Sequence, residues 1–146
     1  TQLEIIQKAS KELNMAYDNN CLDFLNNRKL PIADIPFNDY VQLHFDEKWV
    51  HETYIKKYIN IEPSEKQLID FINKIISKNK KIIITTGKKN VKLLNNIKDK
   101  IDINKVKICD NQNLLELENI VFNTSLLITC HGWISHIASA KKNKTN

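Results

Sequence analysis

Two kinds of segment alternate along most of the chain. Short, mainly apolar runs occur at residues 40–45, 81–86, 105–109 and 125–130. Between them lie longer segments with apolar residues every three or four positions, which is helical spacing. Strands that are apolar on both faces and alternate with helices indicate a parallel sheet covered by helices on both faces. The pattern therefore predicts an α/β, Rossmann-like fold for residues 40–146.

The clearest helical segment follows Pro63. Ser64 and Gln67 stand at the spacing of a capping box, in which each side chain bonds to the other residue's main chain. Apolar residues then recur on one helical face, so residues 64–79 are predicted to form a helix. Three more helices are expected, of which two lie at residues 91–101 and 134–140. The third lies between them, carries Leu114, Leu117 and Val121, and is expected to be capped by Asp110 or Asn111.

The N-terminal part has a different pattern. Residues 3–17 place apolar side chains at helical spacing among charged neighbours, which predicts an amphipathic helix that packs through one face. The periodicity then ends, and Pro31 and Pro36 indicate a linker. We therefore expect an N-terminal helix and linker in residues 1–39, followed by the Rossmann-like domain in residues 40–146.

The composition limits the possible classes of protein. The chain has 146 residues, of which 42% are hydrophobic, enough for one globular domain. No apolar run approaches the roughly 18 residues that a membrane-spanning helix needs. The net charge is +5, but the lysines are spread along the chain and are not gathered in one stripe, which argues against nucleic-acid binding.

The cysteines and the first residue bear on the cellular compartment. Cys21, Cys109 and Cys130 are odd in number and form no C-x-x-C pair, so a disulfide framework is not expected. No signal segment is found at the start, where the chain opens on Thr1. These features predict a reduced, cytoplasmic setting and a chain that is a fragment or a processed form.

Function is expected at the carboxyl ends of the strands, where open parallel sheets bind their ligands. Both glycines of the chain lie there, Gly87 after the second strand and Gly132 after the fourth. Glycine permits a positive φ and the close approach of a ligand, although any turn between a strand and a helix favours it. Neither glycine belongs to a dinucleotide-binding or P-loop motif.

The densest cluster of reactive side chains is residues 130–136, Cys-His-Gly-Trp-Ile-Ser-His. It leads from a strand into the first turn of a helix, where free main-chain N–H groups attract phosphate. Ser135, His136 and the main chain from Gly132 could hold a pyrophosphate. Two alternatives stay open. His136 and Trp133 can be structural core residues, or the cysteine and histidines can bind zinc, although their spacing matches no established zinc site and no fourth ligand is near.

Lysines follow two other strands. Lys48 and Trp49 come after the first strand, where the lysine ammonium group could bind a phosphate. A charged loop with one aromatic anchor is the alternative. Lys88, directly after Gly87, is a weaker candidate, since without an anionic ligand it is an ordinary surface residue.

Taken together, residues 40–140 resemble the C-terminal domain of the family 9 glycosyltransferases, the heptosyltransferase-like enzymes that build lipopolysaccharide cores. In this family a Leu-rich helix and a buried strand lead into the motif D-[ST]-G-x-x-H-x-A-x-A, and residues 110–140 show the same order. His136, Ala138 and Ala140 match the motif in register.

Two shorter elements also resemble the family, and three positions depart from it. Lys48 and the tryptophan after it are similar to the family's K-W element. The Thr-Thr-Gly run that ends at Gly87 is similar to the family's strand-end glycine. His131 stands where the family has Asp, Trp133 where Gly is usual, and Asn90 near the place of an acidic residue that would bind a ribose.

The resemblance implies the C-terminal half of a GT-B enzyme that lacks its N-terminal acceptor domain and its last strand and helix. Such an enzyme transfers a sugar from a nucleotide-sugar donor to a saccharide or lipid-linked acceptor, with inversion and without a metal or cofactor. The catalytic base is expected on the missing domain. A cytoplasmic location is implied, and a peripheral contact with the inner membrane is compatible with it. The donor-binding residues are expected to be Lys48, Gly87, Lys88, His131, Gly132, Ser135 and His136.

A non-catalytic domain of the same fold is the alternative, one that binds only a nucleotide or a protein partner. The loss of the family's Asp at His131 and the scarcity of glycine favour it.

Overall fold

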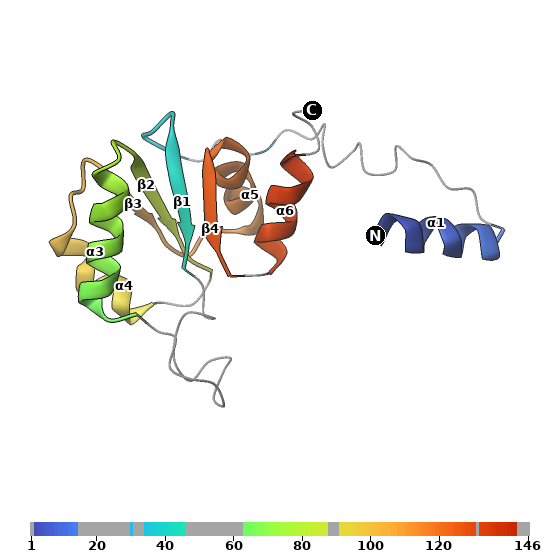
Figure 1. Cartoon of the computed structure of the whole chain (residues 1–146), viewed down its shortest axis with the longest axis horizontal. Coiled ribbons are helices and arrows are strands. Elements are labelled where there is room, and N and C mark those ends of the chain that lie inside the picture. Colours follow the sequence, from blue (N-terminus) through green and yellow to red (C-terminus); the bar gives the residue numbers. More distant parts are fainter. Residues whose placement is uncertain are drawn as a thin grey trace.

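The computed structural model describes residues 2–14, 30, 34–45, 63–87, 91–130 and 132–142, and Figure 1 shows their arrangement. The strands are β1 (Tyr40–His44), β2 (Lys81–Thr85), β3 (Val106–Cys109) and β4 (Leu126–Thr129). The helices are α1 (Gln2–Glu12), α3 (Glu65–Ile76), α4 (Lys92–Ile97), the short 3-10 helix η2 (Lys98–Lys100), α5 (Leu114–Asn123) and α6 (Trp133–Lys142).

The four strands form one parallel sheet in the order β3-β2-β1-β4. All three neighbouring pairs are parallel, and His44 at the end of β1 lies in register with Thr85 of β2 and Thr129 of β4. The α/β, Rossmann-like fold that the sequence predicts is confirmed, and so are the four strands near their expected positions. The two central strands are mainly apolar and are buried because helices cover both faces of the sheet.

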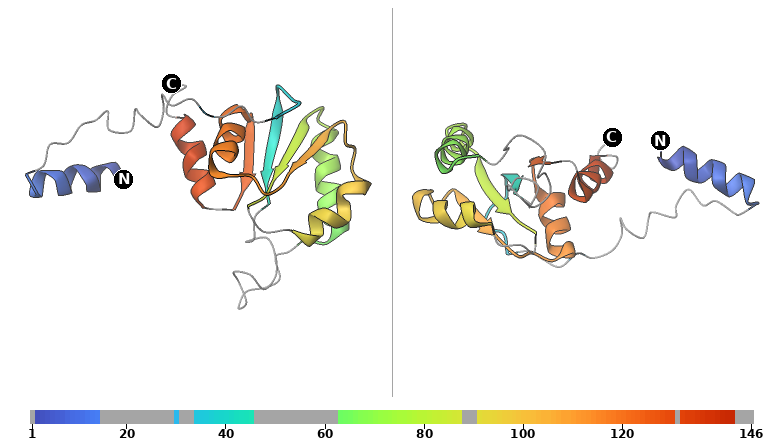
Figure 2. Two further views of the ribbon diagram at one scale, coloured as in Figure 1. Left: turned by 180° about the vertical axis from the view of Figure 1, so that it is seen from behind. Right: turned by 90° about the horizontal axis from the view of Figure 1, so that it is seen from below.

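Helices cover both faces of the sheet, as predicted. On one face, Leu68 and Ile72 of α3 and Leu94 of α4 share a buried cluster with Leu43 and Ile84 of the sheet. On the other face, Ile120 of α5 packs with Tyr40, Ile83 and Cys109. Helix α6 packs against α5 and β4. Figure 2 shows α3 and α4 on one side of the sheet, with α5 and α6 on the opposite side.

Helix α3 begins as the sequence predicts but ends earlier. The Ser64 hydroxyl accepts a hydrogen bond from the Gln67 N–H at 3.2 Å, and the Gln67 side-chain oxygen accepts one from the Ser64 N–H at 2.9 Å. This is the predicted capping box. The helix ends at Ile76, because the chain turns through Asn79, whose φ is 57°.

The start of α5 differs from the prediction. Asn113 is the N-cap, and its side-chain oxygen accepts hydrogen bonds from the N–H groups of Leu115 and Glu116 at 2.9 and 3.0 Å. Asn111 takes a left-handed conformation instead, with a φ of 53°. Its N–H donates to the Thr86 hydroxyl at 3.2 Å, which ties this turn to the end of β2. The predicted cap at Asp110 or Asn111 is therefore wrong.

Two other helical segments are shorter than expected. The periodic segment 91–101 forms α4 only as far as Ile97 and then tightens into η2. Helix α1 ends at Glu12, and the side chains of Ile5, Ile6 and Leu13 are 69%, 52% and 68% exposed. Figures 1 and 2 show α1 apart from the sheet, so the expected packing of its apolar face is not found among the described residues.

Residues 34–39, which precede β1, contact the sheet. Phe37 is buried with Tyr40 and Ile83, and Ile35 packs against the same cluster. The Lys81 ammonium group lies 4.7 Å from the centre of the Phe37 ring. No helix in the described part of the chain is long and apolar enough to cross a membrane.

Candidate functional site

The order of the strands places a switch point between β1 and β4. The chain runs from β1 to its neighbour β2 and then to β3 at one edge of the sheet. Helix α5 then leads back across the sheet to β4, which pairs with β1 at the opposite edge. Helices that leave neighbouring strands toward opposite faces open a crevice at the carboxyl ends of those strands, where such sheets bind ligands. The residues that follow β1 and β4 are therefore the first to consider.

Gly87 and Gly132 lie at this edge of the sheet, as predicted. Gly87 follows β2, and Gly132 lies between β4 and α6. Strand β1 separates β2 from β4. Gly87 does not have a positive φ, so its backbone conformation does not require glycine. A Cβ atom added there would meet no atom within 4 Å, so the space above Gly87 is open.

Three of the predicted donor-binding residues, Lys48, Lys88 and His131, lie outside the described residues, as does Asn90. The expectation that Lys48 shares a crevice with Gly87 and Gly132 therefore remains a prediction. The sequence also predicts a broken helical stretch through Tyr54, Ile55 and Tyr58, and this stretch lies outside the described residues as well.

The remaining two predicted residues, Ser135 and His136, lie in the first turn of α6. The Ser135 hydroxyl donates to the Gly132 carbonyl at 2.6 Å and accepts from the Gly132 N–H at 3.3 Å. This hydroxyl is therefore engaged by its own helix terminus. His136 is exposed, and the neighbouring Trp133 is 43% exposed, so neither is a buried core residue.

Sequence reasoning missed a buried polar cluster at the same edge. His44 Nδ1 lies 2.9 Å from the Thr85 hydroxyl oxygen, and Gln42 Nε2 donates to that oxygen at 3.0 Å. Gln42 and Thr85 are fully buried, and His44 is 2% exposed. Alternate residues of a strand share one face, so Gln42 and His44 lie on the face that carries Tyr40, beneath α5 and α6.

The cluster contains one unsatisfied atom. Gln42 Oε1 is buried and has no hydrogen-bond partner among the described residues. An unsatisfied buried acceptor costs about 1–3 kcal/mol, whereas an apolar residue of similar size would cost nothing of this kind. The signal in the sequence was two polar residues at alternate positions of an otherwise apolar strand, Gln42 and His44.

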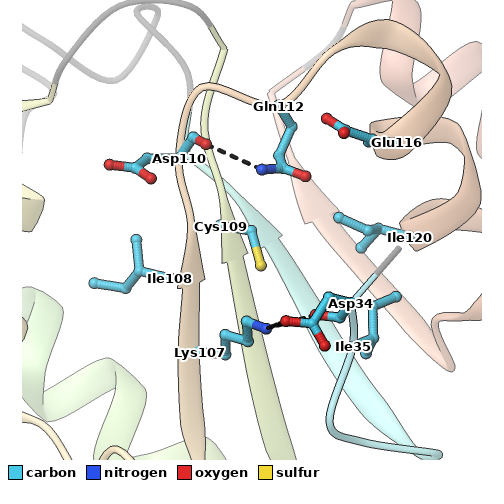
Figure 3. A pocket seen from close by; sticks show the side chains of 9 residues that line it. All are labelled: Asp34, Ile35, Lys107, Ile108, Cys109, Asp110, Gln112, Glu116 and Ile120. Carbon is cyan, nitrogen blue, oxygen red and sulfur yellow. Dashed lines mark hydrogen bonds and ion pairs between the residues drawn. The ribbon is translucent and has the colours of Figure 1, made fainter. Parts of the chain in front are cut away.

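An open pocket of about 390 Å³ lies beside the edge strand β3. Figure 3 shows the Cys109 thiol at its centre, with Asp110, Gln112 and Glu116 at one end and the Lys107–Asp34 pair at the other. Lys107 Nζ lies 2.9 Å from the Asp34 carboxylate, and this contact lowers the pKa of Asp34. Gln112 donates to the Asp110 carbonyl, and the Glu116 carboxylate accepts from the Asn113 N–H. These polar groups are thus held by local contacts.

Burial governs the chemistry of Cys109 in this pocket. The loss of solvent around the thiol raises the pKa of Cys109 above its ordinary value. The thiolate is the reactive form of cysteine, so Cys109 is poorly suited to act as a nucleophile. Among the described residues, no group of three or more His, Cys, Asp or Glu side chains is arranged to hold a metal ion.

Comparisons of the chain with protein-family models, curated proteins and solved structures found no match.

Proposed function

We propose that this chain is the nucleotide-sugar-binding domain of an inverting, metal-independent glycosyltransferase whose acceptor is a saccharide or a lipid-linked saccharide. The position of α6 is the observation that supports the proposal most. Its first turn follows β4 at the switch point of the sheet, where the motif around His136 resembles the family 9 glycosyltransferases. A helix terminus at this place suits the diphosphate of a donor, since its N–H groups and dipole attract anions.

In this proposal the chain stabilises the departing nucleoside diphosphate. Negative charge grows on the leaving group as the bond to the sugar breaks, and donors already in place bind it more tightly in the transition state. The main chain from Gly132 and the side chain of His136 supply such donors, and the proposal adds Lys48 and His131, which lie outside the described residues. The base that deprotonates the acceptor is proposed to lie on another domain.

A calorimetric titration of the 146-residue chain with ADP, GDP, UDP and CDP tests the proposal. Binding of at least one nucleotide is expected, and His136→Ala should weaken it by about 1.5–3 kcal/mol if the imidazole donates to a charged phosphate. Because His136 is exposed, its removal should leave the melting temperature nearly unchanged. Ser139→Ala is the matched control, since Ser139 is an exposed residue one turn further along α6.

Two outcomes would contradict the proposal. If no diphosphate binds the wild-type chain, the donor-binding role is wrong. If the chain alone transfers a sugar, the catalytic base is not on another domain.

The second candidate is a non-catalytic nucleotide-binding or partner-binding domain of the same fold. The double engagement of the Ser135 hydroxyl by Gly132 favours it, because that hydroxyl is partly withdrawn from a ligand. Diphosphate binding with no discrimination between a nucleoside diphosphate and its sugar-bearing form would support this candidate.

A further inference from the structure

The pocket beside β3 has hydrogen-bond acceptors at one end. Gln112 Nε2 donates to the Asp110 carbonyl at 3.0 Å, so the side-chain oxygen of Gln112 lies on the other side of its amide group. Figure 3 shows this oxygen directed toward α5, from which the Glu116 carboxylate reaches the same end of the pocket. An amide oxygen and a carboxylate accept hydrogen bonds and donate none. In the described part of the chain, no group donates to the Gln112 oxygen.

The helix cap engages only one oxygen of the Glu116 carboxylate. Its Oε2 accepts from the Asn113 N–H at 2.9 Å, which completes the capping box of α5. Among the described residues, Oε1 has no hydrogen-bond partner and the carboxylate has no cationic partner. Lys107, the lysine that lines this pocket, is paired with Asp34 at the other end. The acceptor end therefore has an uncompensated negative charge, on a chain whose net charge is +5.

Apolar side chains line the pocket beyond its acceptor end. Ile35 and Ile120 contribute to its wall, and the free thiol of Cys109 lies at its centre. Glu116 and Ile120 are one turn apart on the same face of α5, so the charge and the apolar wall are neighbours. The volume of about 390 Å³ falls within the range of about 300–1,000 Å³ that small-molecule sites occupy. A ligand that matches these features has a donating, positively charged head and a short apolar body.

We propose that this pocket binds a small organic cation, whose ammonium or guanidinium group donates hydrogen bonds to Glu116 and Gln112. The alkyl part of the cation lies against the apolar side chains beyond them. A metal ion fits less well, because no group of three or more His, Cys, Asp or Glu side chains is arranged to hold one in the described part of the chain. The inference does not rest on the proposed function, since the pocket lies beside β3 and the proposed diphosphate site follows β4, the opposite edge strand.

NMR titrations of the full ¹⁵N-labelled chain with n-pentylammonium, 1-pentanol and pentanoate test the inference. These probes share one alkyl chain and differ in charge. We expect n-pentylammonium at millimolar concentrations to shift the amide signals of Cys109, Gln112 and Glu116, and the neutral and anionic probes to bind more weakly. Added salt should weaken the binding of n-pentylammonium, because screening reduces the attraction between its charge and the carboxylate.

Glu116→Gln removes the charge without loss of the helix cap, because glutamine can accept the same hydrogen bond from the Asn113 N–H. The variant should bind n-pentylammonium about threefold more weakly, the effect of one partly exposed ion pair, at a nearly unchanged melting temperature. Asp70→Asn is the matched control. It removes the same charge from an exposed residue of α3, which Figure 2 shows on the opposite side of the sheet from α5, and it should leave the binding unchanged.

The possible outcomes decide for or against a cation site. Equal affinities for the three probes would show an apolar cavity that does not select charge, and equal losses in Glu116→Gln and Asp70→Asn would show a general effect of net charge. Either result would overturn the inference, as would the absence of shifts around Cys109 with n-pentylammonium. A chain that binds n-pentylammonium in this pocket but none of the nucleoside diphosphates would support the inference and refute the proposed function.

Discussion

Replacement of Tyr40 by Phe tests how the face beneath α5 is held together. Tyr40 is fully buried at the start of β1, and its hydroxyl donates to the Ile120 carbonyl of α5 at 2.7 Å. Phenylalanine fills the same space but leaves this carbonyl without its partner. Because an unsatisfied buried carbonyl costs about 1–3 kcal/mol, Tyr40→Phe should lower the free energy of unfolding at pH 7 by that amount.

The effect of Tyr40→Phe should also depend on pH. Burial, with a smaller contribution from Cys109, raises the pKa of Tyr40 far above that of a tyrosine in the unfolded chain. Above pH 10 the unfolded tyrosine ionises while the folded one stays neutral, so the wild type loses stability as the pH rises. At pH 11 this loss is about 1.4 kcal/mol. Phenylalanine has no such loss, so the difference between the two proteins should shrink by that amount.

Urea unfolding followed by far-UV circular dichroism at pH 7 and pH 11 measures both effects. The lysines and the other tyrosines titrate equally in the two proteins, so the comparison isolates Tyr40. An equal difference in stability at the two pH values would show that Tyr40 is not held neutral by burial. A difference below about 0.5 kcal/mol at pH 7 would show that the bond to Ile120 contributes no more than an average surface contact.

Two further predictions concern the core and the thiols. Ile84 of β2 is fully buried in the core beneath α3 and α4, so Ile84→Ala should lower the free energy of unfolding by about 2–5 kcal/mol. Ile103 is the control, because its side chain is 76% exposed. Ile103→Ala should change the free energy of unfolding by less than about 0.5 kcal/mol in the same urea titration. Cys109 is buried and its pKa is raised, so iodoacetamide at pH 8 should modify it far more slowly in the native chain than in urea. Peptide mass spectrometry measures the two rates, and equal rates would show that the thiol is accessible.

Features set by neighbouring residues were predictable from the sequence. The Ser64–Gln67 capping box depends on two side chains three positions apart, and the structure contains it as predicted. The strands were found because each is a short apolar run between turn-forming residues. The cap of α5 was not found, although its residue type was right. The choice of Asn113 over Asn111 depends on the hydrogen bond from Asn111 to Thr86, which is 25 residues away in the chain.

The polar cluster in the sheet could not be predicted for the same reason. The contacts from Gln42 and His44 to Thr85 cross 43 and 41 residues of sequence. They exist only because β1 and β2 pair in one register, which a single sequence does not specify. A shift of one residue would turn Thr85 to the opposite face of the sheet, against α3 and α4. Glycine and helix-terminus signals in the sequence thus gave no indication of this buried polar cluster.

The two faces of strand β1 differ in polarity, because its side chains alternate between them. Leu43 and Phe45 point into the apolar cluster beneath α3 and α4, while Gln42 and His44 point to the opposite face. A polar residue on the first face would disrupt a continuous core. On the second face, the Thr85 hydroxyl provides one hydrogen bond to each of the two buried polar residues. Substitutions at adjacent positions of this one strand should therefore differ in kind. Leu43→Ala should open a cavity in the core and lower the free energy of unfolding, whereas Gln42→Leu removes the unsatisfied oxygen and should keep or raise it.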